Sequence, residues 1–132
     1  MNNLARMLIG LTACLTLGSA AAADFDGSRP LICAPTEAIQ VVPGDAIVRA
    51  RPRDIGAPSF LRVDIAGRQI SGPKRVTPIK SIERDEHQIL LQGTELGFGW
   101  TFALDQQLGD MTLTFADHVG AVVLTGSCTP AR

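Results

Sequence analysis

After residue 23 the chain consists largely of short runs in which apolar and polar residues alternate. The two clearest runs are 100–105 and 111–116, where large apolar side chains share one face and small or polar side chains share the other. A period of two is typical of a β-strand with one buried face. No ten-residue stretch carries the helical period, so the pattern predicts an all-β fold.

Turn-forming residues divide these runs. Pro43-Gly44-Asp45 predicts the turn of a hairpin between 38–42 and 46–50, because Pro fixes φ and Gly permits positive φ. The segment 51–59 holds two prolines and a glycine and is expected to be a loop or an irregular edge. Further strands are predicted at 60–66, 68–70, 78–84, 87–92, 100–105, 111–116 and 120–128.

The first 23 residues have a different pattern, that of a cleavable secretory signal peptide. Arg6 precedes a mostly apolar run from Met7 to Leu17, and the small residues up to Ala23 offer a cleavage site before Asp24. We therefore expect a mature chain of residues 24–132, forming a single β domain that is periplasmic or secreted.

Two other interpretations of this segment stay open. An uncleaved anchor would need about 20 predominantly apolar residues. The run Leu11 to Cys14 resembles a lipobox, in which Cys14 would be lipidated, although the residues after Cys14 remain apolar. No later stretch is apolar for long enough to span a bilayer, so the mature chain is expected to have no transmembrane segment.

Two cysteines remain after residue 23, Cys33 and Cys128. An even number in an exported chain predicts a disulfide, which would bring the first and last strands together. We therefore expect seven to nine short strands in a single antiparallel meander barrel of the calycin-like kind, with a two-sheet sandwich as the alternative. The formal net charge of −1 gives no electrostatic footprint for nucleic acid.

Candidate catalytic groups are few. His87 and His118 are the only side chains that titrate near neutral pH unperturbed, and each follows a charged or turn-forming residue. Most carboxylates fall in expected turns, where Asp commonly accepts hydrogen bonds from the local backbone. The chain has neither a G-x-S-x-G nor a C-x-x-C motif. No catalytic residue, metal or cofactor is predicted.

Two sets of residues are candidates for contact with a ligand or partner. Arg49, Arg51 and Arg53 alternate, so an extended backbone would present all three on one side, suited to an anion. Pro52 interrupts this stripe, and an exposed edge protected by charge is the other interpretation. The glycine-rich segment 93–100 is expected to present Phe98, while Trp100 heads a strand and either fills the core or contacts a ligand.

The C-terminal half, 60–128, resembles a group of small exported proteobacterial proteins without an assigned function. The residues that carry the resemblance are Phe60 to Asp64, Leu91-Gln92-Gly93, Gly99-Trp100, Asp105, Gly109 to Leu113, and Gly126-Ser127-Cys128. In overall plan the chain is also similar to small periplasmic β-barrel inhibitors of lysozyme and metalloproteases, a similarity of architecture that implies no shared motif.

Three functional hypotheses follow. The leading one is a non-enzymatic binding or inhibitor-like module that presents 51–59 and 93–98 to a protein or a small apolar ligand. It requires an apolar cavity with a loop rim if the ligand is small. The second is a small extracytoplasmic hydrolase that uses carboxylates with His87 or His118 in one cleft. The third is a cell-envelope accessory protein that joins a larger complex through a strand edge.

Overall fold

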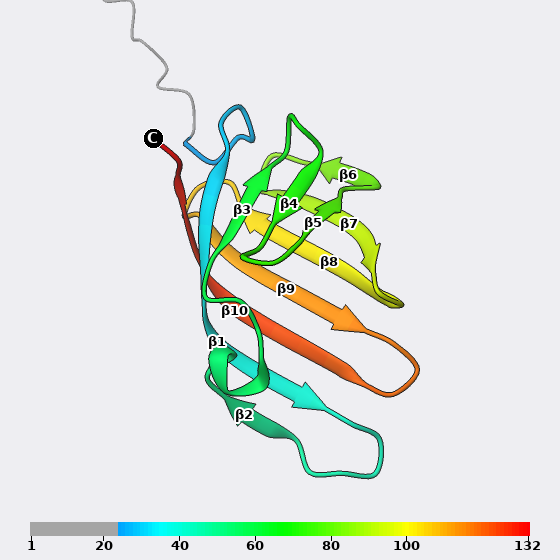
Figure 1. Ribbon diagram of the computed structural model, residues 1–132. Helices are drawn as coiled ribbons and strands as arrows, with labels where there is room; N and C mark the ends of the chain where they lie inside the picture. The colour runs from blue at the N-terminus through cyan, green and yellow to red at the C-terminus, as the bar shows by residue number, and fades with distance from the viewer. Residues whose placement is uncertain (1–23) are drawn as a thin grey trace, which may run out of the picture.

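The computed structural model of the chain describes residues 24–132, and the predicted signal peptide with Cys14 lies outside the described residues. In this range the backbone forms ten strands and one short 3₁₀ helix (Figure 1). Their bounds are β1 (Leu31–Val41), β2 (Val48–Ala50), η1 (Pro52–Ile55), β3 (Leu61–Asp64), β4 (Gln69–Ser71), β5 (Val76–Pro78), β6 (Ser81–Arg84), β7 (Gln88–Glu95), β8 (Phe98–Asp105), β9 (Asp110–Ala116) and β10 (Ala121–Pro130). Between residues 24 and 132, no helix has the length and hydropathy required to cross a membrane.

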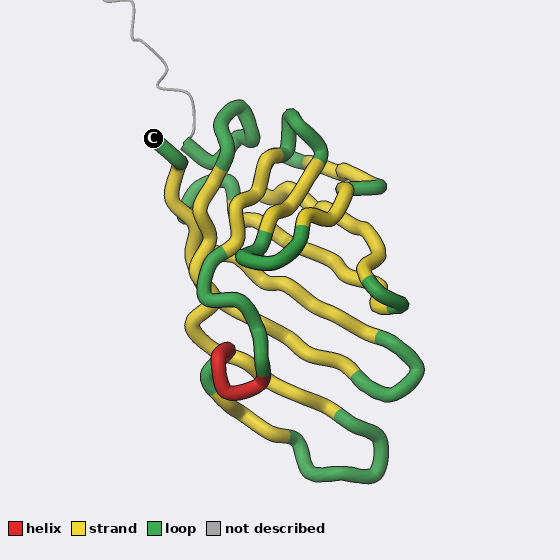
Figure 2. The backbone as a smooth tube through the Cα atoms, viewed as in Figure 1, coloured by secondary structure: helices red, strands yellow, loops and turns green. Residues whose placement is uncertain are grey.

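All ten strands belong to one antiparallel sheet that curls into a barrel-like shape, with turns joining the strands (Figure 2). Their hydrogen-bonded order is β5-β4-β3-β1-β10-β9-β8-β7-β6, and β2 pairs with the second half of β1. Most strands that are consecutive in sequence are therefore neighbours in the sheet, and the last strand, β10, pairs with the first, β1. The prediction of an all-β, barrel-like fold is confirmed.

The two ends of this sheet are consecutive pieces of the chain. Only Ile79 and Lys80 separate β5, which pairs with β4, from β6, which pairs with β7. The N–H of Ile79 donates to the carbonyl of Arg68 (2.9 Å), and the N–H of Lys80 donates to the carbonyl of Gln92 (2.8 Å). This short link holds the two ends of the sheet next to each other. It also divides the single strand predicted at 78–84, one reason why ten strands are found rather than seven to nine.

The core fills one half of the curl. Side chains on the inward rows of the long strands are almost completely enclosed, among them Leu31, Ile89, Leu91, Phe102, Leu104 and Leu124. Full burial of each such side chain stabilises the fold by about 1.5–3 kcal/mol. Phe25, just before β1, packs against this cluster.

Strand β1 is longer than predicted. The sequence pattern placed the first strand at 38–42, whereas β1 begins at Leu31 and runs through Pro35. The register with β10 shifts between Pro35 and Glu37, so that Thr36 is an extra residue in a β-bulge. A proline in a central strand is tolerated at a bulge, because the ladder does not require its missing N–H there.

The sulfur atoms of Cys33 and Cys128 lie 2.06 Å apart, at disulfide bonding distance. The two residues face each other in the register of β1 and β10, and both are buried. The expected pairing is present, and it joins strands that are 95 residues apart in sequence. It ties the first and last strands of the sheet to each other directly.

Candidate functional site: an apolar cavity with a cationic rim

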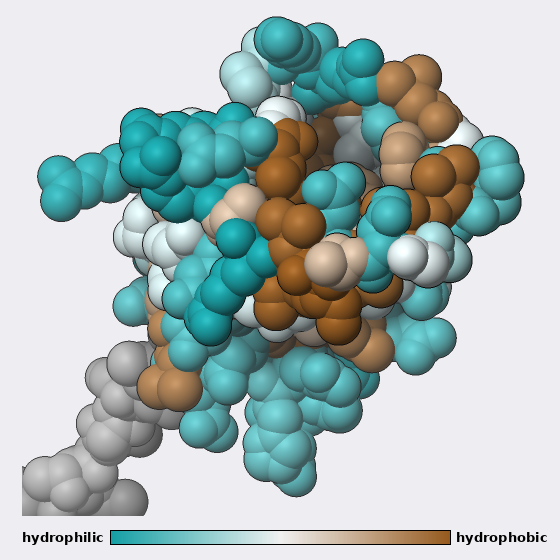
Figure 3. All heavy atoms as spheres, turned by 90° about the horizontal axis from the view of Figure 1, so that it is seen from below, coloured by the Kyte–Doolittle hydropathy of each residue, from teal (hydrophilic) through white to brown (hydrophobic). Residues whose placement is uncertain are grey.

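A cavity of about 540 Å³ lies at the open end of the curl. Figure 3 looks at this end of the molecule, where hydrophobic side chains gather around a hollow and polar side chains surround them. The segment 56–59 and the loop 72–75 border it. The apolar side chains of its wall are Ala57, Pro58, Leu61, Ile70, Pro73, Trp100, Leu113 and Phe115.

The floor of the cavity continues the inward rows of β8 and β9. Along these strands Phe102 pairs with Leu113, deep in the core, and Trp100 pairs with Phe115 one step nearer the open end. Directly opposed side chains on one face of an antiparallel pair pack against each other. The alternation that points these side chains into the core therefore also gives the cavity an apolar floor.

Trp100 is both a core residue and a cavity residue. It is 3 % exposed, and its indole lies over Gly93, its partner on β7, where any Cβ would overlap the ring. The Nε1–H of the indole is buried and has no hydrogen-bond acceptor among residues 24–132. A buried donor without an acceptor costs about 1–3 kcal/mol. Trp100 thus has an unsatisfied donor and also belongs to the wall of the cavity.

The rim of the cavity carries three cations and one carboxylate, Arg53, Lys74, Arg75 and Glu95. Arg75 and Glu95 are paired at 3.9 Å, and Arg53 lies 3.7 Å from Asp54. Both separations are long for ion pairs between exposed groups, which are worth about 0–1 kcal/mol. Lys74 forms no ion pair within the described part of the chain. The rim is therefore positive overall.

The arginine stripe predicted from the sequence is divided by the structure. Pro52 begins η1, so the backbone is no longer extended when it reaches Arg53. Arg49 on β2 pairs with Glu37 at 2.6 Å, and Arg51 pairs with Asp54 at 2.9 Å. Of these three arginines, Arg53 is the one in the cavity wall.

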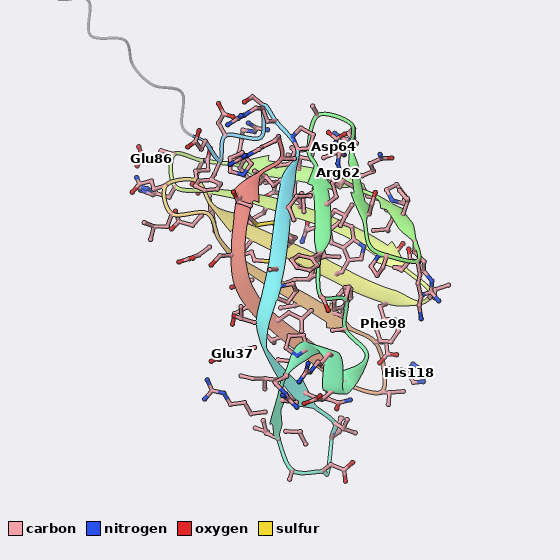
Figure 4. All side chains as sticks on the ribbon, turned by 60° about the vertical axis from the view of Figure 1, so that its left-hand side comes forward. Glu37, Arg62, Asp64, Glu86, Phe98 and His118 are labelled. Carbon is pink, nitrogen blue, oxygen red and sulfur yellow. A yellow bond between two sulfur atoms is a disulfide. The ribbon has the colours of Figure 1, made fainter. Side chains whose placement is uncertain are left out.

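The segment 93–100 is a hairpin and not the glycine-rich loop that the sequence suggested. β7 runs to Glu95 and β8 starts at Phe98, which leaves Leu96 and Gly97 as a two-residue turn. Both have positive φ, 47° and 86°, as a type I′ turn requires. Phe98 is 38 % exposed at the end of this hairpin, outside the cavity wall (Figure 4). Glu95 is the member of the turn region that reaches the cavity.

Several aspartates hold the turns in which they lie, as expected from the sequence. Asp85 Oδ1 accepts the N–H groups of His87 (2.8 Å) and Gln88 (2.9 Å). These two bonds lower the pKa of the Asp85 carboxyl below its ordinary value. Asp105 Oδ1 accepts the N–H groups of the second and third residues after it (2.7 and 2.9 Å), which lower its pKa likewise.

The two histidines lie far apart. His87 is next to Glu86, which Figure 4 labels at the opposite end of the molecule from His118. His87 Nε2 lies 3.1 Å from Glu86 Oε1, and both side chains are largely exposed. A second hollow of about 370 Å³ is bordered by Asp85, His87, Asp105 and Asp110. The hollow is thus bordered by one histidine and three aspartates, groups of the kind that the hydrolase hypothesis requires.

Some residues of the main cavity were not singled out by the sequence. Lys74 and Arg75 lie between the strands predicted at 68–70 and 78–84 and were given no role. Leu113 and Phe115 were predicted only as the inner face of a strand. The alternation that placed Phe115 inward was a usable signal, but nothing local to 71–76 says which strand that loop faces. In residues 24–132, no three His, Cys, Asp or Glu side chains are grouped as a metal site requires.

Comparisons with protein-family models, with curated proteins and with solved structures give no match to this chain. The fold defines the class, a barrel-like antiparallel β protein with a disulfide and a cavity at one end. The function must be argued from the geometry of that cavity.

Proposed function

We propose that this protein is a non-enzymatic binding protein that holds a small apolar ligand in the cavity at the open end of its barrel. The observation that carries the proposal is the cavity itself. Its volume of about 540 Å³ falls in the range of about 300–1,000 Å³ that is typical of small-molecule sites. Its wall combines eight apolar side chains with six polar ones. Small-molecule sites likewise pair an apolar lining with polar groups that orient the ligand.

The position of the cavity supports the proposal. It lies beside a tightly packed core, so its floor is fixed by side chains such as Leu113 that also pack inward. Its rim includes 56–59, which is part of the 51–59 loop that the sequence suggested for contact, together with 72–75. A rigid floor with a loop rim lets a ligand be enclosed without unfolding the sheet.

The test uses N-phenyl-1-naphthylamine, a neutral apolar dye whose fluorescence rises in an apolar site. Wild-type protein should bind about one dye per chain. Gly72→Phe should abolish binding, because a Cβ at Gly72 would point toward Leu61 Cδ2 at 3.8 Å without overlap, and the ring would then occupy the cavity.

Gly99→Phe is the matched control. Gly99 is exposed on β8, has no positive φ, and a Cβ there would meet only the carbonyl of Ala116 at 4.0 Å. This variant adds the same side chain outside the cavity and should bind the dye as wild type does. Equal binding by Gly72→Phe and wild type, or no binding by wild type, would contradict the proposal.

We propose further that binding takes place outside the cytoplasm, in the periplasm or after secretion. The disulfide supports this location, since such bonds persist in oxidising compartments and are rare in the cytosol. Fractionation of cells that express the full chain, with mass measurement of the recovered protein, tests it. A product that begins at Asp24 with no free thiol is expected. A cytosolic, uncleaved chain would refute the location, and an added lipid mass would place the start at Cys14.

Binding of a protein partner through the same end is the second candidate. It is favoured by exposed apolar side chains at three hairpin tips, Ile47, Leu96 and Val119. Figure 1 shows the three turns on the same side of the sheet. Crosslinking in envelope fractions should then give one stoichiometric partner whose capture is lost in Leu96→Asp and kept in Gly72→Phe. Capture that is insensitive to Leu96→Asp would exclude this surface.

A further inference from the structure

We propose that the ligand is a single-chain amphiphile with an anionic head group, whose chain occupies the cavity and whose head lies at the cationic rim. This inference rests on the proposed function and adds the chemical class of the ligand. The shared chemistry is an alkyl chain that ends in a carboxylate or a phosphate.

The chain of such a ligand would lie between two apolar walls. Trp100, Leu113 and Phe115 form one wall from β8 and β9, and Leu61 and Ile70 form the other from β3 and β4. Each methylene group removed from water in this space tightens binding by about fourfold. An apolar chain is therefore the part of the ligand that supplies most of the affinity.

The negative charge of the head group is inferred from the charges that border the cavity. Arg53, Lys74 and Arg75 are cationic, and Glu95 is the one opposing carboxylate among the wall residues. This positive rim occurs on a chain whose formal net charge is −1, so it is a local feature and not the average of the surface. Charge complementarity selects an anion, and repels a cationic amphiphile.

The ion pairs of these cations within the described chain are weak or absent, so an anionic ligand can compete for them. The Arg75 guanidinium lies 3.9 Å from Glu95, beyond good hydrogen-bonding distance, and Lys74 has no carboxylate partner within residues 24–132. Since 72–75 is a loop between β4 and β5, both side chains extend from the rim without being held in the sheet. A carboxylate or phosphate at the mouth would meet two cations in adjacent positions.

The experiment compares 1-decanol, decanoate and decyl phosphate, which share one chain and differ in the head, by displacement of N-phenyl-1-naphthylamine from the full oxidised protein. Decanoate or decyl phosphate should bind about 5- to 10-fold more tightly than decanol, as expected for two partly exposed ionic contacts. The double variant Lys74→Ala/Arg75→Ala should lose that preference and keep its affinity for decanol within about twofold.

Arg62→Ala is the matched control. Arg62 lies on β3 beside Leu61, faces outward, and pairs with Asp64 at 3.6 Å (Figure 4). This variant removes a cation from β3, the strand next to β4, without changing a residue of the cavity wall, and the preference for the anions should survive it. The stronger of the two anions identifies the head group as carboxylate or phosphate.

Two outcomes separate this inference from the proposed function. If decanol displaces the dye as well as the two anions do, the cavity binds apolar ligands but the inference about the head group is overturned. If the dye itself does not bind, the proposed function fails and the inference fails with it. A preference for anions that persists in Lys74→Ala/Arg75→Ala would overturn the assignment of the head to this loop.

Discussion

Removal of the Cys33–Cys128 disulfide should lower the free energy of unfolding by about 4–5 kcal/mol. The bond joins residues 95 apart in sequence, so the unfolded chain is closed into a loop that includes most of the described residues. A loop of about 100 residues loses conformational entropy equivalent to about 4.7 kcal/mol at 25 °C in the chain-entropy model. Domains of ordinary stability have only about 5–15 kcal/mol in total.

The perturbation is the double substitution Cys33→Ala/Cys128→Ala, because both positions are buried and alanine leaves no unpaired polar group there. Urea unfolding followed by the emission of Trp100 measures the change. For a domain of this size 1 kcal/mol corresponds to about 4–8 °C, so the midpoint of thermal unfolding should fall by about 20 °C or more.

Wild-type protein unfolded with and without a reductant is the control, since only the cross-link differs between these two samples. Reduced wild type and the alanine variant should agree within about 1 kcal/mol, the difference left for packing of the sulfur atoms. Oxidised and reduced protein of equal stability would refute the reasoning, because it would mean that the loop closure does not restrict the unfolded chain.

The remaining predictions concern turns and packing. Gly93→Ala should destabilise the fold by about 1–3 kcal/mol, measured by urea unfolding, because its Cβ would overlap the Trp100 indole; unchanged stability would show that the ring is free to move. Leu96→Asn should stabilise the protein by about 0.5–1 kcal/mol in the same assay, since Asn adopts positive φ more readily, and a loss of stability would contradict the type I′ turn. The lowered pKa values of Asp85 and Asp105 mean that the folded state holds its protons more weakly, so stability is fully present above the ordinary pKa of 3.8 and falls as the pH drops further. Unfolding from pH 7 to pH 2 should show this fall, and Asp105→Asn, whose amide oxygen accepts the same bonds without titrating, should make it shallower.

The features that could be predicted from sequence are those set by local chemistry. Alternation along 100–105 and 111–116 determined which faces of β8 and β9 point inward, and this carried over to the structure without change. Aspartates such as Asp105 were expected in turns, and there they accept backbone hydrogen bonds. The pairing of Cys33 with Cys128 followed from parity once residues 1–23 were set aside.

The features that sequence could not supply depend on how distant segments meet. The cavity exists because the curl brings 56–59 and 72–75 opposite the face that carries Trp100. No local pattern encodes that meeting, so Lys74 was not a candidate. The segment 93–100 shows a different difficulty. Gly93 was assigned to a glycine-rich loop that presents Phe98, whereas it lies within β7 and makes room for an indole from the next strand.

The most direct measurement of the central claim is energy transfer from Trp100 to N-phenyl-1-naphthylamine. Trp100 is the only tryptophan and the chain has no tyrosine, so the donor has one known position in the cavity wall. Our account predicts saturable quenching of Trp100 emission at about one dye per chain, present in Gly99→Phe and absent in Gly72→Phe. Dye binding that leaves Trp100 emission unchanged, or quenching that persists in Gly72→Phe, would show that this cavity is not the binding site.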